Sequence, residues 1–287
     1  MKNINESGKD GQPMNKNLFS LKGKVVIITG AAGRLGRQHA DAVASFEGSP
    51  VLLDLNKESL IDQATVLNNK YGVDTISYVV DITNGQEIDQ NCKDILDRYG
   101  KIDALVNNAA NNPTVNDQSG NEFSRLESFP MESWIADVGV GLTGAFLCAK
   151  HYGTAISTNP EGGVIINISS DLGLIAPDQR LYEKPGLPKD HQPVKPVTYS
   201  VIKTGLIGLT HYLATYWPGL VRCNVLCPGG VGKGLPTEFI EKVITRIPMH
   251  RMAEPGDYQG ALIFLLSDAS KYMSGSNLII DGGWTAL

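Results

Sequence analysis

The fold is decided by the stretch Val25-Val-Ile-Ile-Thr29-Gly30-Ala-Ala-Gly33-Arg34-Leu35-Gly36. A run of β-branched residues leads directly into a glycine-rich turn and then into a helical pattern. Glycines let the backbone turn tightly and approach a pyrophosphate, and the free N–H groups at a helix N-terminus attract its charge. The next apolar run ends in Asp54, 18 residues after Gly36, where a carboxylate can accept hydrogen bonds from ribose hydroxyls. The turn and the carboxylate together predict a dinucleotide-binding site.

Strand-like and helix-like patterns alternate along the rest of the chain. The strand-like runs are apolar throughout, which is typical of strands covered on both faces in a parallel sheet. The alternation never breaks, so we expect one domain with a three-layer, doubly wound α/β fold. The expected strands are Val25 to Thr29, Val51 to Asp54, Ile76 to Val80, Ala104 to Asn107, Val164 to Ile168, Val221 to Leu226 and Leu278 to Ile280, and the expected helices are Leu35 to Phe46, Lys57 to Tyr71, Gly85 to Tyr99, Met131 to Ser157, Ser200 to Tyr216 and Gly256 to Leu266.

The composition is that of a globular protein with a small partner. Of the 287 residues, 42% are hydrophobic and 19% charged, and the 31 glycines exceed the roughly 20 that average usage would give. The net charge of -5 provides no electrostatic footprint for nucleic acid or an anionic membrane. No apolar run approaches the roughly 18 residues of a membrane span, and no signal peptide is expected, so a cytoplasmic location is predicted. We expect the polar residues 1–17 to form a flexible arm before a folded domain at 18–287.

Cysteine and histidine are scattered rather than clustered. The one close cysteine pair, Cys223 and Cys227, has no histidine or second pair placed to complete a tetrahedral zinc site. The four cysteines are therefore expected to be reduced, mostly buried thiols. No metal is predicted, and none of the five histidines is assigned a catalytic role.

A candidate catalytic group is formed by Tyr199-Ser-Val-Ile-Lys203, because residues four apart share one face of a helix. A free phenol titrates near pH 10, and a nearby ammonium group is expected to lower that pKa by favouring the phenolate. Ser169 and Ser170 follow the predicted strand Val164 to Ile168. Ligands of open α/β sheets bind beyond the carboxyl ends of the strands, so these serines are expected at the lip of the site.

From about Phe19 onward the chain resembles the short-chain dehydrogenase/reductase family, whose members have a Rossmann fold. The cofactor turn of the family is matched by Thr29, Gly30 and Gly36, although Arg34 stands at its middle glycine and Gly33 lies one position earlier. Asn107-Asn108-Ala109-Ala110 resembles the family's motif after the fourth strand. The resemblance implies a catalytic set and a cofactor set. The first is Ser170, Tyr199 and Lys203, with Ser169 as the alternative serine, and the second is Gly30, Gly33, Arg34, Leu35, Gly36, Asp54, Asp81, Ile82, Asn108, Ala109, Tyr199, Lys203, Pro228, Gly229 and Val231.

Two family positions are altered. Seven residues after Trp134, where the family has the asparagine of its catalytic tetrad, this chain has Gly141. The resemblance links that asparagine to a proton path from the lysine, which must then use another group or water. After Pro228 and Gly229, the family's nicotinamide-anchoring threonine aligns with Lys233, which leaves backbone contacts from Val231.

Asp54 predicts the cofactor NAD, because a carboxylate at the ribose 2′-position repels the phosphate of NADP. Arg34 is the counter-argument, since a guanidinium near the turn can pair with a phosphate. Comparison of the region from Ser170 to Tyr182 shows a further resemblance to bacterial flagellin-modification oxidoreductases of the nonulosonic and legionaminic sugar pathways. That resemblance implies a sugar or sugar-phosphate alcohol or ketone as substrate. The tail from Asp268 to Trp284 resembles the final helix and strand of the short-chain dehydrogenase/reductase family, which implies an oligomer contact, and a homo-oligomer, a dimer or tetramer, is therefore expected.

Three alternatives remain at the level of sequence. A generic polyol or 3-oxoacyl reductase is the enzymatic one, and a catalytically weak NAD-binding sensor or structural subunit is the other class, favoured by Gly141. The third concerns the proline-rich segment from Gly173 to Thr198. It is expected either to overhang the substrate pocket with polar groups or to be a purely structural flap. The polar groups that could contact a hydroxyl-rich ligand are Asp171, which precedes the segment, and Gln179, Arg180, Tyr182 and His191 within it.

Overall fold

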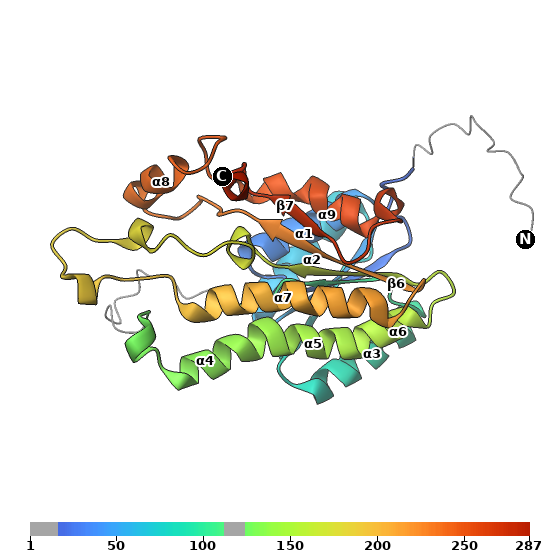
Figure 1. Cartoon of the computed structure of the whole chain (residues 1–287). Coiled ribbons are helices and arrows are strands. Elements are labelled where there is room, and N and C mark those ends of the chain that lie inside the picture. The colour runs from blue at the N-terminus through green and yellow to red at the C-terminus, as the bar shows by residue number, and fades with distance from the viewer. Residues whose placement is uncertain (1–16, 112–123) are drawn as a thin grey trace, which may run out of the picture.

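The computed structural model describes residues 17–111 and 124–287, so the expected N-terminal arm lies, apart from Asn17, outside the described residues. Within these ranges seven parallel strands form one sheet with the order β3-β2-β1-β4-β5-β6-β7 (Figure 1). This order reverses direction between β1 and β4, which is the defining feature of a doubly wound sheet. The strands are β1 (Val25–Thr29), β2 (Ser49–Asp54), β3 (Ile76–Val79), β4 (Ala104–Asn107), β5 (Gly163–Ile168), β6 (Val221–Pro228) and β7 (Asn277–Ile280).

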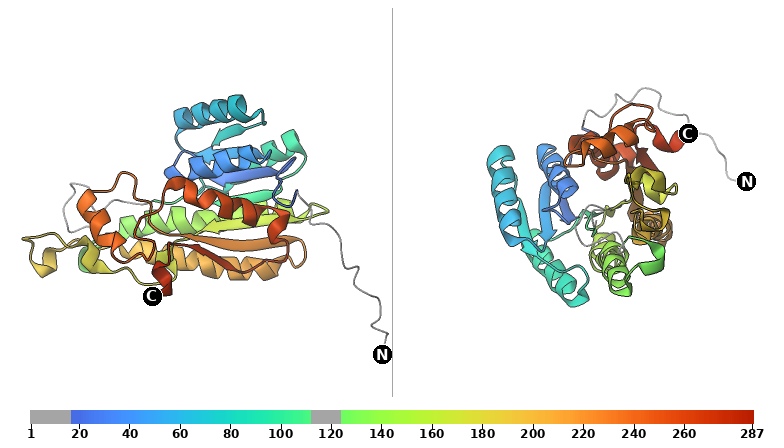
Figure 2. Two further views of the ribbon diagram at one scale, coloured as in Figure 1. Left: turned by 90° about the horizontal axis from the view of Figure 1, so that it is seen from above. Right: turned by 90° about the vertical axis from the view of Figure 1, so that its left-hand side faces the viewer.

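Helices cover both faces of the sheet, and Figure 2 shows the three layers end-on. The alternation of β1 explains why: Val26 and Ile28 are buried under α1, α2 and α9, whereas Val25 and Ile27 are buried under α3, α5 and α7. Strand β1 is thus apolar on both of its faces, as its continuous apolar sequence predicted. The helices are α1 (Arg34–Ser45), α2 (Lys57–Tyr71), α3 (Gly85–Tyr99), α4 (Met131–Val138), α5 (Gly144–Cys148), α6 (Thr154–Ser157), α7 (Val197–Tyr216), α8 (Thr237–Ile244) and α9 (Gln259–Leu266).

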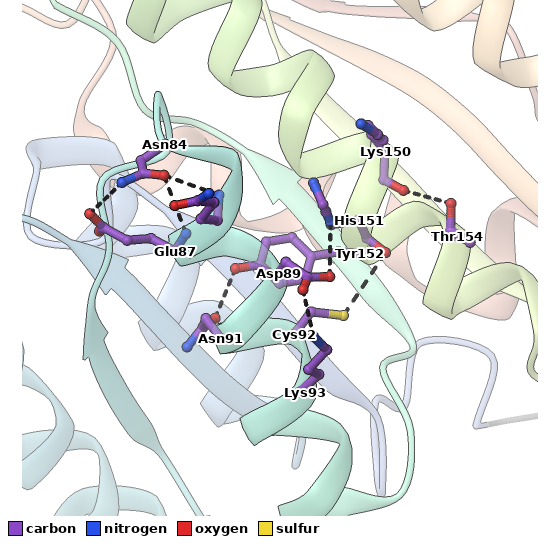
Figure 3. Close-up of polar contacts among 11 residues, drawn as sticks. Asn84, Glu87, Asp89, Asn91, Cys92, Lys93, Lys150, His151, Tyr152 and Thr154 are labelled. Carbon is purple, nitrogen blue, oxygen red and sulfur yellow. Dashed lines mark hydrogen bonds and ion pairs between the residues drawn. The ribbon is translucent and has the colours of Figure 1, made fainter.

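The helix predicted from Met131 to Ser157 is continuous, but two π-helical segments, residues 139–143 and 149–153, separate α4, α5 and α6. The second segment is fastened to α3 (Figure 3): the Tyr152 hydroxyl donates to Asn91 Oδ1 at 2.8 Å, and His151 Nδ1 lies 3.5 Å from Asp89 Oδ1. Tyr152 is fully buried, so its hydroxyl needs this acceptor. The contacts hold the long helix against the face of the sheet that carries α7.

Three helices differ from the sequence prediction by three residues or more. Helix α9 begins at Gln259 rather than Gly256, because Pro255–Tyr258 form a 3-10 turn before it. Helix α7 begins at Val197 rather than Ser200, which brings Tyr199 inside its first turn. Helix α8 was not predicted, because its apolar residues do not join the main core. Instead, Val243 of α8 packs with Leu181 of the segment 173–198 and with Ile247 in a separate small cluster. Tyr182 and Phe239 bring their ring centroids within 5.4 Å across the same contact.

The expectation for the cysteines is confirmed, since all four are free and buried. Across the described part of the chain, no group of histidine, cysteine and acidic side chains is arranged to hold a metal ion. No helix in that part is both long and apolar enough to span a membrane.

Candidate active site

The predicted site residues lie at the carboxyl edge of the sheet. The glycine turn follows β1 and the residues Asn108 and Ala109 follow β4, so both stand at the point where the strand order reverses. Ser170 lies just beyond β5, and Pro228 ends β6. Ligands of doubly wound folds bind in the crevice outside this edge.

The glycine turn has the geometry of a phosphate cradle. Gly30 has a φ of +63°, a conformation that side chains disfavour, and a Cβ there would lie 2.8 Å from the Ala109 Cα. A Cβ on Gly36 would overlap the Gly30 carbonyl oxygen. Gly33 is exposed, and the first N–H groups of α1 have no intrahelical acceptor. The turn therefore fits the pyrophosphate of a dinucleotide.

Asn108 fastens the end of β4 to this turn. Its side-chain amide donates to the carbonyl oxygens of Thr29 and Gly30 at 2.9 and 3.1 Å. In return, the Thr29 hydroxyl oxygen accepts the backbone N–H groups of Asn108 and Ala109, each at 3.0 Å. These reciprocal bonds explain why a threonine and an asparagine flank the cofactor turn.

Asp54 lies beside the same turn. Its Oδ2 accepts the Ala32 N–H at 3.0 Å and its Oδ1 accepts the Asn56 N–H at 3.1 Å, which leaves one lone pair on each oxygen for a further donor. Two arginines have fixed contacts around the turn. Arg37 Nε donates to the Ala32 carbonyl at 3.0 Å, whereas the Arg34 guanidinium lies 3.3 Å from the Cβ position of Gly234, beyond β6.

The remaining predicted cofactor residues are spread along the edge. Asp81 follows β3 and accepts the backbone N–H and hydroxyl of Thr83 on its Oδ1, while Ile82 is buried against Gly144. Beyond β6, the Gly229 carbonyl accepts the Tyr258 hydroxyl at 2.7 Å. Val231 forms an isolated parallel bridge with Ala253, which gives this stretch a defined backbone. Leu35 is half-buried in the first turn of α1.

Ser170, Tyr199 and Lys203 meet between β5 and α7. The Ser170 hydroxyl donates to Asp171 Oδ1 at 2.6 Å and also hydrogen bonds the phenol of Tyr199. Lys203 is buried, and its Nζ donates to the Ile168 carbonyl at 2.9 Å. The Ser169 hydroxyl turns away to the Lys203 carbonyl at 2.7 Å. Of the two serines, Ser170 is thus the one beside the phenol.

The expected pKa shift of Tyr199 is absent, and the physical reason is burial. Removal of the phenolate from water raises the pKa of Tyr199 to about 12, although the hydrogen bond from Ser170 acts in the opposite direction. Lys203 Nζ lies 5.8 Å from the ring centroid, and burial lowers its own pKa to about 8. Desolvation therefore outweighs the predicted ammonium effect in this pocket.

Gly141 does more than lack the family's asparagine. It is buried in the π-helical segment 139–143, and a Cβ there would lie 2.7 Å from Ile202 Cγ2, next to Lys203. Ile202 thus occupies the volume that an asparagine side chain would need. The neighbouring buried polar contact is a hydrogen bond from the Thr198 hydroxyl to Asp137 Oδ2, at 2.7 Å.

The segment 173–198 contributes a residue that sequence reasoning missed. Its predicted polar groups mostly point elsewhere: Arg180 pairs with Asp178 at 2.8 Å, and His191 is exposed beside Asp190. By contrast, Lys195 lines a pocket together with Tyr199 and Lys203, and its Nζ lies 3.8 Å from the Tyr199 ring centroid. The only signal for Lys195 in the sequence is its position four residues before the tyrosine.

The fold and the site define a nicotinamide-dependent oxidoreductase of the doubly wound α/β type. Residues 24–182 match the model of the short chain dehydrogenases, and residues 190–285 match that of the enoyl-(acyl carrier protein) reductases. The chain therefore belongs to the short-chain dehydrogenase/reductase family, which acts on alcohols and ketones, and the predicted family and fold are confirmed.

Relatives of different specificity are similar over nearly the whole chain. An NADP-dependent mannitol dehydrogenase of Alternaria alternata is 31% identical, with 94% of this chain and 95% of the relative covered. The post-translational flagellin modification protein A of Campylobacter coli is 28% identical, with 92% and 99% covered. The crystal structure of an NAD+-bound xylitol dehydrogenase matches with a TM-score of 0.79 and 27% identity, over 92% of this chain and 99% of that one.

Proposed function

We propose that the protein is an NAD-dependent oxidoreductase that interconverts a secondary alcohol and a ketone on a sugar or sugar phosphate. Its proposed role is in the synthesis of a flagellin glycan. The observation that carries this proposal is the meeting of Ser170, Tyr199 and Lys203 at the carboxyl edge of the sheet, on the same edge as the glycine turn. A hydroxyl hydrogen bonded to a phenol, with an ammonium group 5.8 Å from the centre of the phenol ring, supplies the groups that alcohol oxidation requires.

Each catalytic side chain has a distinct role in the proposed reaction. In the oxidative direction, bound NAD would accept the hydride from the carbinol carbon, and the hydroxyl proton would pass to the phenolate form of Tyr199, so that the alcohol becomes a ketone. Ser170 would hydrogen bond the substrate oxygen. Because burial raises its pKa to about 12, Tyr199 carries its proton at neutral pH, which is the form that protonates a ketone oxygen, so neutral pH favours reduction and oxidation requires ionisation of the phenol. Reduction reverses each transfer.

Bound NAD supplies the hydride acceptor, and three parts of the chain would hold it. The turn Gly30, Gly33, Arg34, Leu35 and Gly36 would hold the pyrophosphate, because its glycines leave room for close approach and the first N–H groups of α1 have no intrahelical acceptor. Asp54, Asp81, Ile82, Asn108 and Ala109 would hold the adenosine. Lys203 and the backbone of Pro228, Gly229 and Val231 would hold the nicotinamide riboside.

Support for NAD over NADP comes from Asp54. Its two free lone pairs suit ribose hydroxyls, whereas its charge opposes a phosphate on the 2′-oxygen. Arg37 is the competing group, since its guanidinium donates to the carbonyl of Ala32, whose N–H donates to Asp54. The relatives include an NADP-dependent enzyme, so the balance between Asp54 and Arg37 decides the cofactor.

Support for a sugar-like substrate comes from the relatives, which include a mannitol dehydrogenase and a flagellin modification protein. The test is a panel of polyols, sugars and their phosphates offered to the purified protein with NAD or NADP, with reduced nicotinamide read by absorbance. We expect NADH formation from at least one polyhydroxylated alcohol. Binding of NAD without turnover of any compound would contradict the proposal and favour a cofactor sensor.

We also propose that the protein is a homo-oligomer. Phe146 of α5 and Tyr212 and Tyr216 of α7 are large, exposed apolar side chains on neighbouring helices of one face of the sheet. Burying such groups against a second copy is favourable by about 25 cal/mol per Å². Light scattering on the eluted protein should give a dimer or tetramer mass, and a monomer at micromolar concentration would contradict this assembly.

A further inference from the structure

Asp171 is a buried carboxylate just beyond β5 that has no role in the reaction as proposed above. It directly follows Ser170 and is only 5% exposed. Its Oδ1 accepts the Ser170 hydroxyl at 2.6 Å and the Leu172 N–H at 2.8 Å. The first distance is typical of a hydrogen bond from a hydroxyl to a charged carboxylate. Asp171 is therefore joined to the serine that lies beside the phenol of Tyr199.

The hydrogen bonds of Ser170 have a defined direction. A serine hydroxyl has one proton to donate and two lone pairs with which to accept. The proton of Ser170 goes to Asp171, so the hydrogen bond between Ser170 and Tyr199 is donated by the phenol. The second lone pair accepts the Leu172 N–H at 3.2 Å. Phenol, hydroxyl and carboxylate thus form a chain in which each proton points toward Asp171.

The phenol needs such a chain because its usual proton path is altered. The family resemblance implies a path from the lysine to an asparagine, but this protein has Gly141 there, and Ile202 fills the space of the missing side chain. Burial also keeps Tyr199 protonated at neutral pH. Oxidation therefore requires an acceptor for the phenol proton, and the Asp171 carboxylate lies two hydrogen bonds away.

The groups around Asp171 suit a proton acceptor. Burial raises the pKa of Asp171, and the nearby Asp281 carboxylate adds to this rise. The hydrogen bonds that the carboxylate accepts and the charge of Lys195 lower the pKa. The other titratable neighbours are neutral at pH 7 because burial raises their own pKa values, and they are Tyr182, Cys227 and Tyr258. A raised pKa makes Asp171 a stronger base than an exposed aspartate.

We propose that Asp171 accepts, through Ser170, the proton that Tyr199 gives up during oxidation at neutral pH. As the alcohol proton passes to the Tyr199 oxygen, the phenol proton moves to the Ser170 oxygen and the serine proton moves to Asp171 Oδ1. Tyr199 and Ser170 each end with one proton, as they began. The alcohol has lost its O–H bond, and Asp171 has gained one and become neutral, after which it releases the proton to water.

Reduction runs these transfers backward. A protonated Asp171 no longer needs the hydrogen bond from Ser170, so the serine proton becomes available to Tyr199 or to the oxygen of a ketone. Asp171 acts through Ser170 and does not touch the substrate, so it is a positioning residue for the proton chain. This inference rests on the proposed oxidoreductase function and adds a proton path to it.

The kinetic test uses Asp171→Asn. An asparagine keeps the size of the side chain and an oxygen that accepts from Ser170, but it does not take up a proton. Ser170→Ala breaks the chain, and Asp190→Asn removes an exposed carboxylate of the segment 173–198 as the control. Oxidation of D-mannitol, xylitol or glycerol, whichever the wild type turns over fastest, is measured with saturating NAD. The kcat/KM is compared at several pH values below the pKa of about 8 that burial gives Lys195 and Lys203.

We expect Asp171→Asn to lower kcat/KM at pH 7 by about 100-fold, the lower end of what an acid–base group contributes. The deficit should shrink about tenfold per pH unit as the pH rises, because the variant depends on the small ionised fraction of Tyr199. Adding Asp171→Asn to Ser170→Ala should cause no further loss. Asp190→Asn should match the wild type at every pH.

Three kinetic results would overturn the role of Asp171. An unchanged or faster Asp171→Asn would show that the carboxylate acts at most as a fixed charge, because removal of a negative charge favours the phenolate. A deficit of the same size at every pH would show a structural role. A further loss in the double variant would show that Asp171 does not act through Ser170.

An infrared measurement separates this inference from the proposed function. The band of the protonated Asp171 carboxyl is the one that acidification produces in the wild type and not in Asp171→Asn. Tyr199→Phe should shift this band, because it removes the phenol that hydrogen bonds to Ser170. A band that Tyr199→Phe leaves in place would overturn the chain. Turnover of none of the three alcohols would count against the proposed function, and the infrared result would then decide on Asp171.

Discussion

The cofactor turn, residues 29–36, and the pocket at residues 168–203 lie on the same edge of the sheet but are built from different materials. The turn uses backbone geometry: Gly30 at φ +63° and Gly36 packed against the Gly30 carbonyl. The pocket uses charged and hydroxylic side chains, with Ser170, Tyr199 and Lys203 in contact and Lys195 across the ring. The turn tolerates almost no added atom, whereas the pocket can change its ligand by changing one side chain.

We infer from this difference that the turn and the pocket have separate roles in binding. In the proposed function the turn holds the pyrophosphate, a part that all dinucleotides share, so its geometry can be the same in relatives that act on mannitol or xylitol. The pocket has to distinguish one alcohol from another, and its segment 173–198 is fastened to α8 rather than to the main core. Substitutions in the two regions should therefore fail in different ways.

The largest expected effect belongs to the pocket. Tyr199→Phe removes the proton carrier and keeps the ring, so kcat should fall by about 100- to 10,000-fold, the usual share of general acid–base catalysis. The affinity for NAD should stay within a few-fold of wild type, because the turn is untouched. Steady-state rates and calorimetric titration of NAD test the pair of effects, and retained turnover would disprove the role of Tyr199.

The second prediction concerns the pH dependence of folding stability and a residue of α1, the helix that follows the cofactor turn. His39 of α1 is fully buried, neither ring nitrogen has a hydrogen-bond partner within the described residues, and burial lowers its pKa from 6.5 to about 4. The unfolded chain therefore binds a proton below pH 6.5 that the folded chain refuses. The folded state should lose about 3 kcal/mol between pH 6.5 and pH 4 from this group.

Chemical denaturation across that pH range checks the prediction, with His39→Leu as the comparison. The variant should show a smaller loss of unfolding free energy on acidification, whatever its stability at pH 7. Equal pH dependence in both proteins would show that His39 does not titrate in this way.

A matched pair of glycine substitutions compares the crowded turn with an open position of α7 outside the pocket. Gly36→Ala places a Cβ against the Gly30 carbonyl oxygen and 2.7 Å from Ala31 Cα, so the turn must shift, at a cost of about 1–3 kcal/mol and with weaker NAD binding. Gly208→Ala, on the open side of α7, meets no atom within 4 Å and should stabilise the helix by about 0.5–1 kcal/mol. Thermal unfolding and NAD titration measure both, and equal effects would remove the distinction between the regions.

The smallest expected effect is a change of cofactor preference. Asp54→Ser removes the charge that opposes the 2′-phosphate, so the ratio of kcat/KM for NAD over that for NADP should fall about tenfold or more, the cost of roughly 1.4 kcal/mol of lost discrimination. Adding Arg37→Gln should reverse part of the gain with NADP, because Arg37 is the neighbouring cation. An unchanged ratio in Asp54→Ser would show that cofactor choice is made elsewhere.

The sequence was most informative where local pattern and burial agree. All seven strands were predicted within about two residues, because continuous apolar runs such as that of β1 have no other place than a doubly covered sheet. Helix α8 was missed, since its apolar face packs on Leu181 and Ile247, and this contact exists only in the folded chain. The start of α7 at Val197 was placed three residues late.

Within the site, sequence motifs located the turn and the groups Ser170, Tyr199 and Lys203, but not their electrostatics. The pKa of Tyr199 depends on how deeply the fold buries its hydroxyl, and that depth is a tertiary property. Lys195 escaped notice because its place depends on a hydrogen bond to Gln179, 16 residues earlier. Arg37 was overlooked in favour of Arg34, since only the folded turn brings the Arg37 side chain to the carbonyl of Ala32, the residue whose N–H binds Asp54.

We propose that the carboxylate of Asp54 makes this family member an NAD enzyme, although relatives such as the Alternaria alternata mannitol dehydrogenase use NADP. The most direct test is the ratio of kcat/KM for NAD and NADP in the wild-type protein, with one alcohol substrate at a fixed concentration and ionic strength. A ratio of about ten or more in favour of NAD is the expected result. An equal or higher value for NADP would contradict the claim and give the deciding role to Arg37.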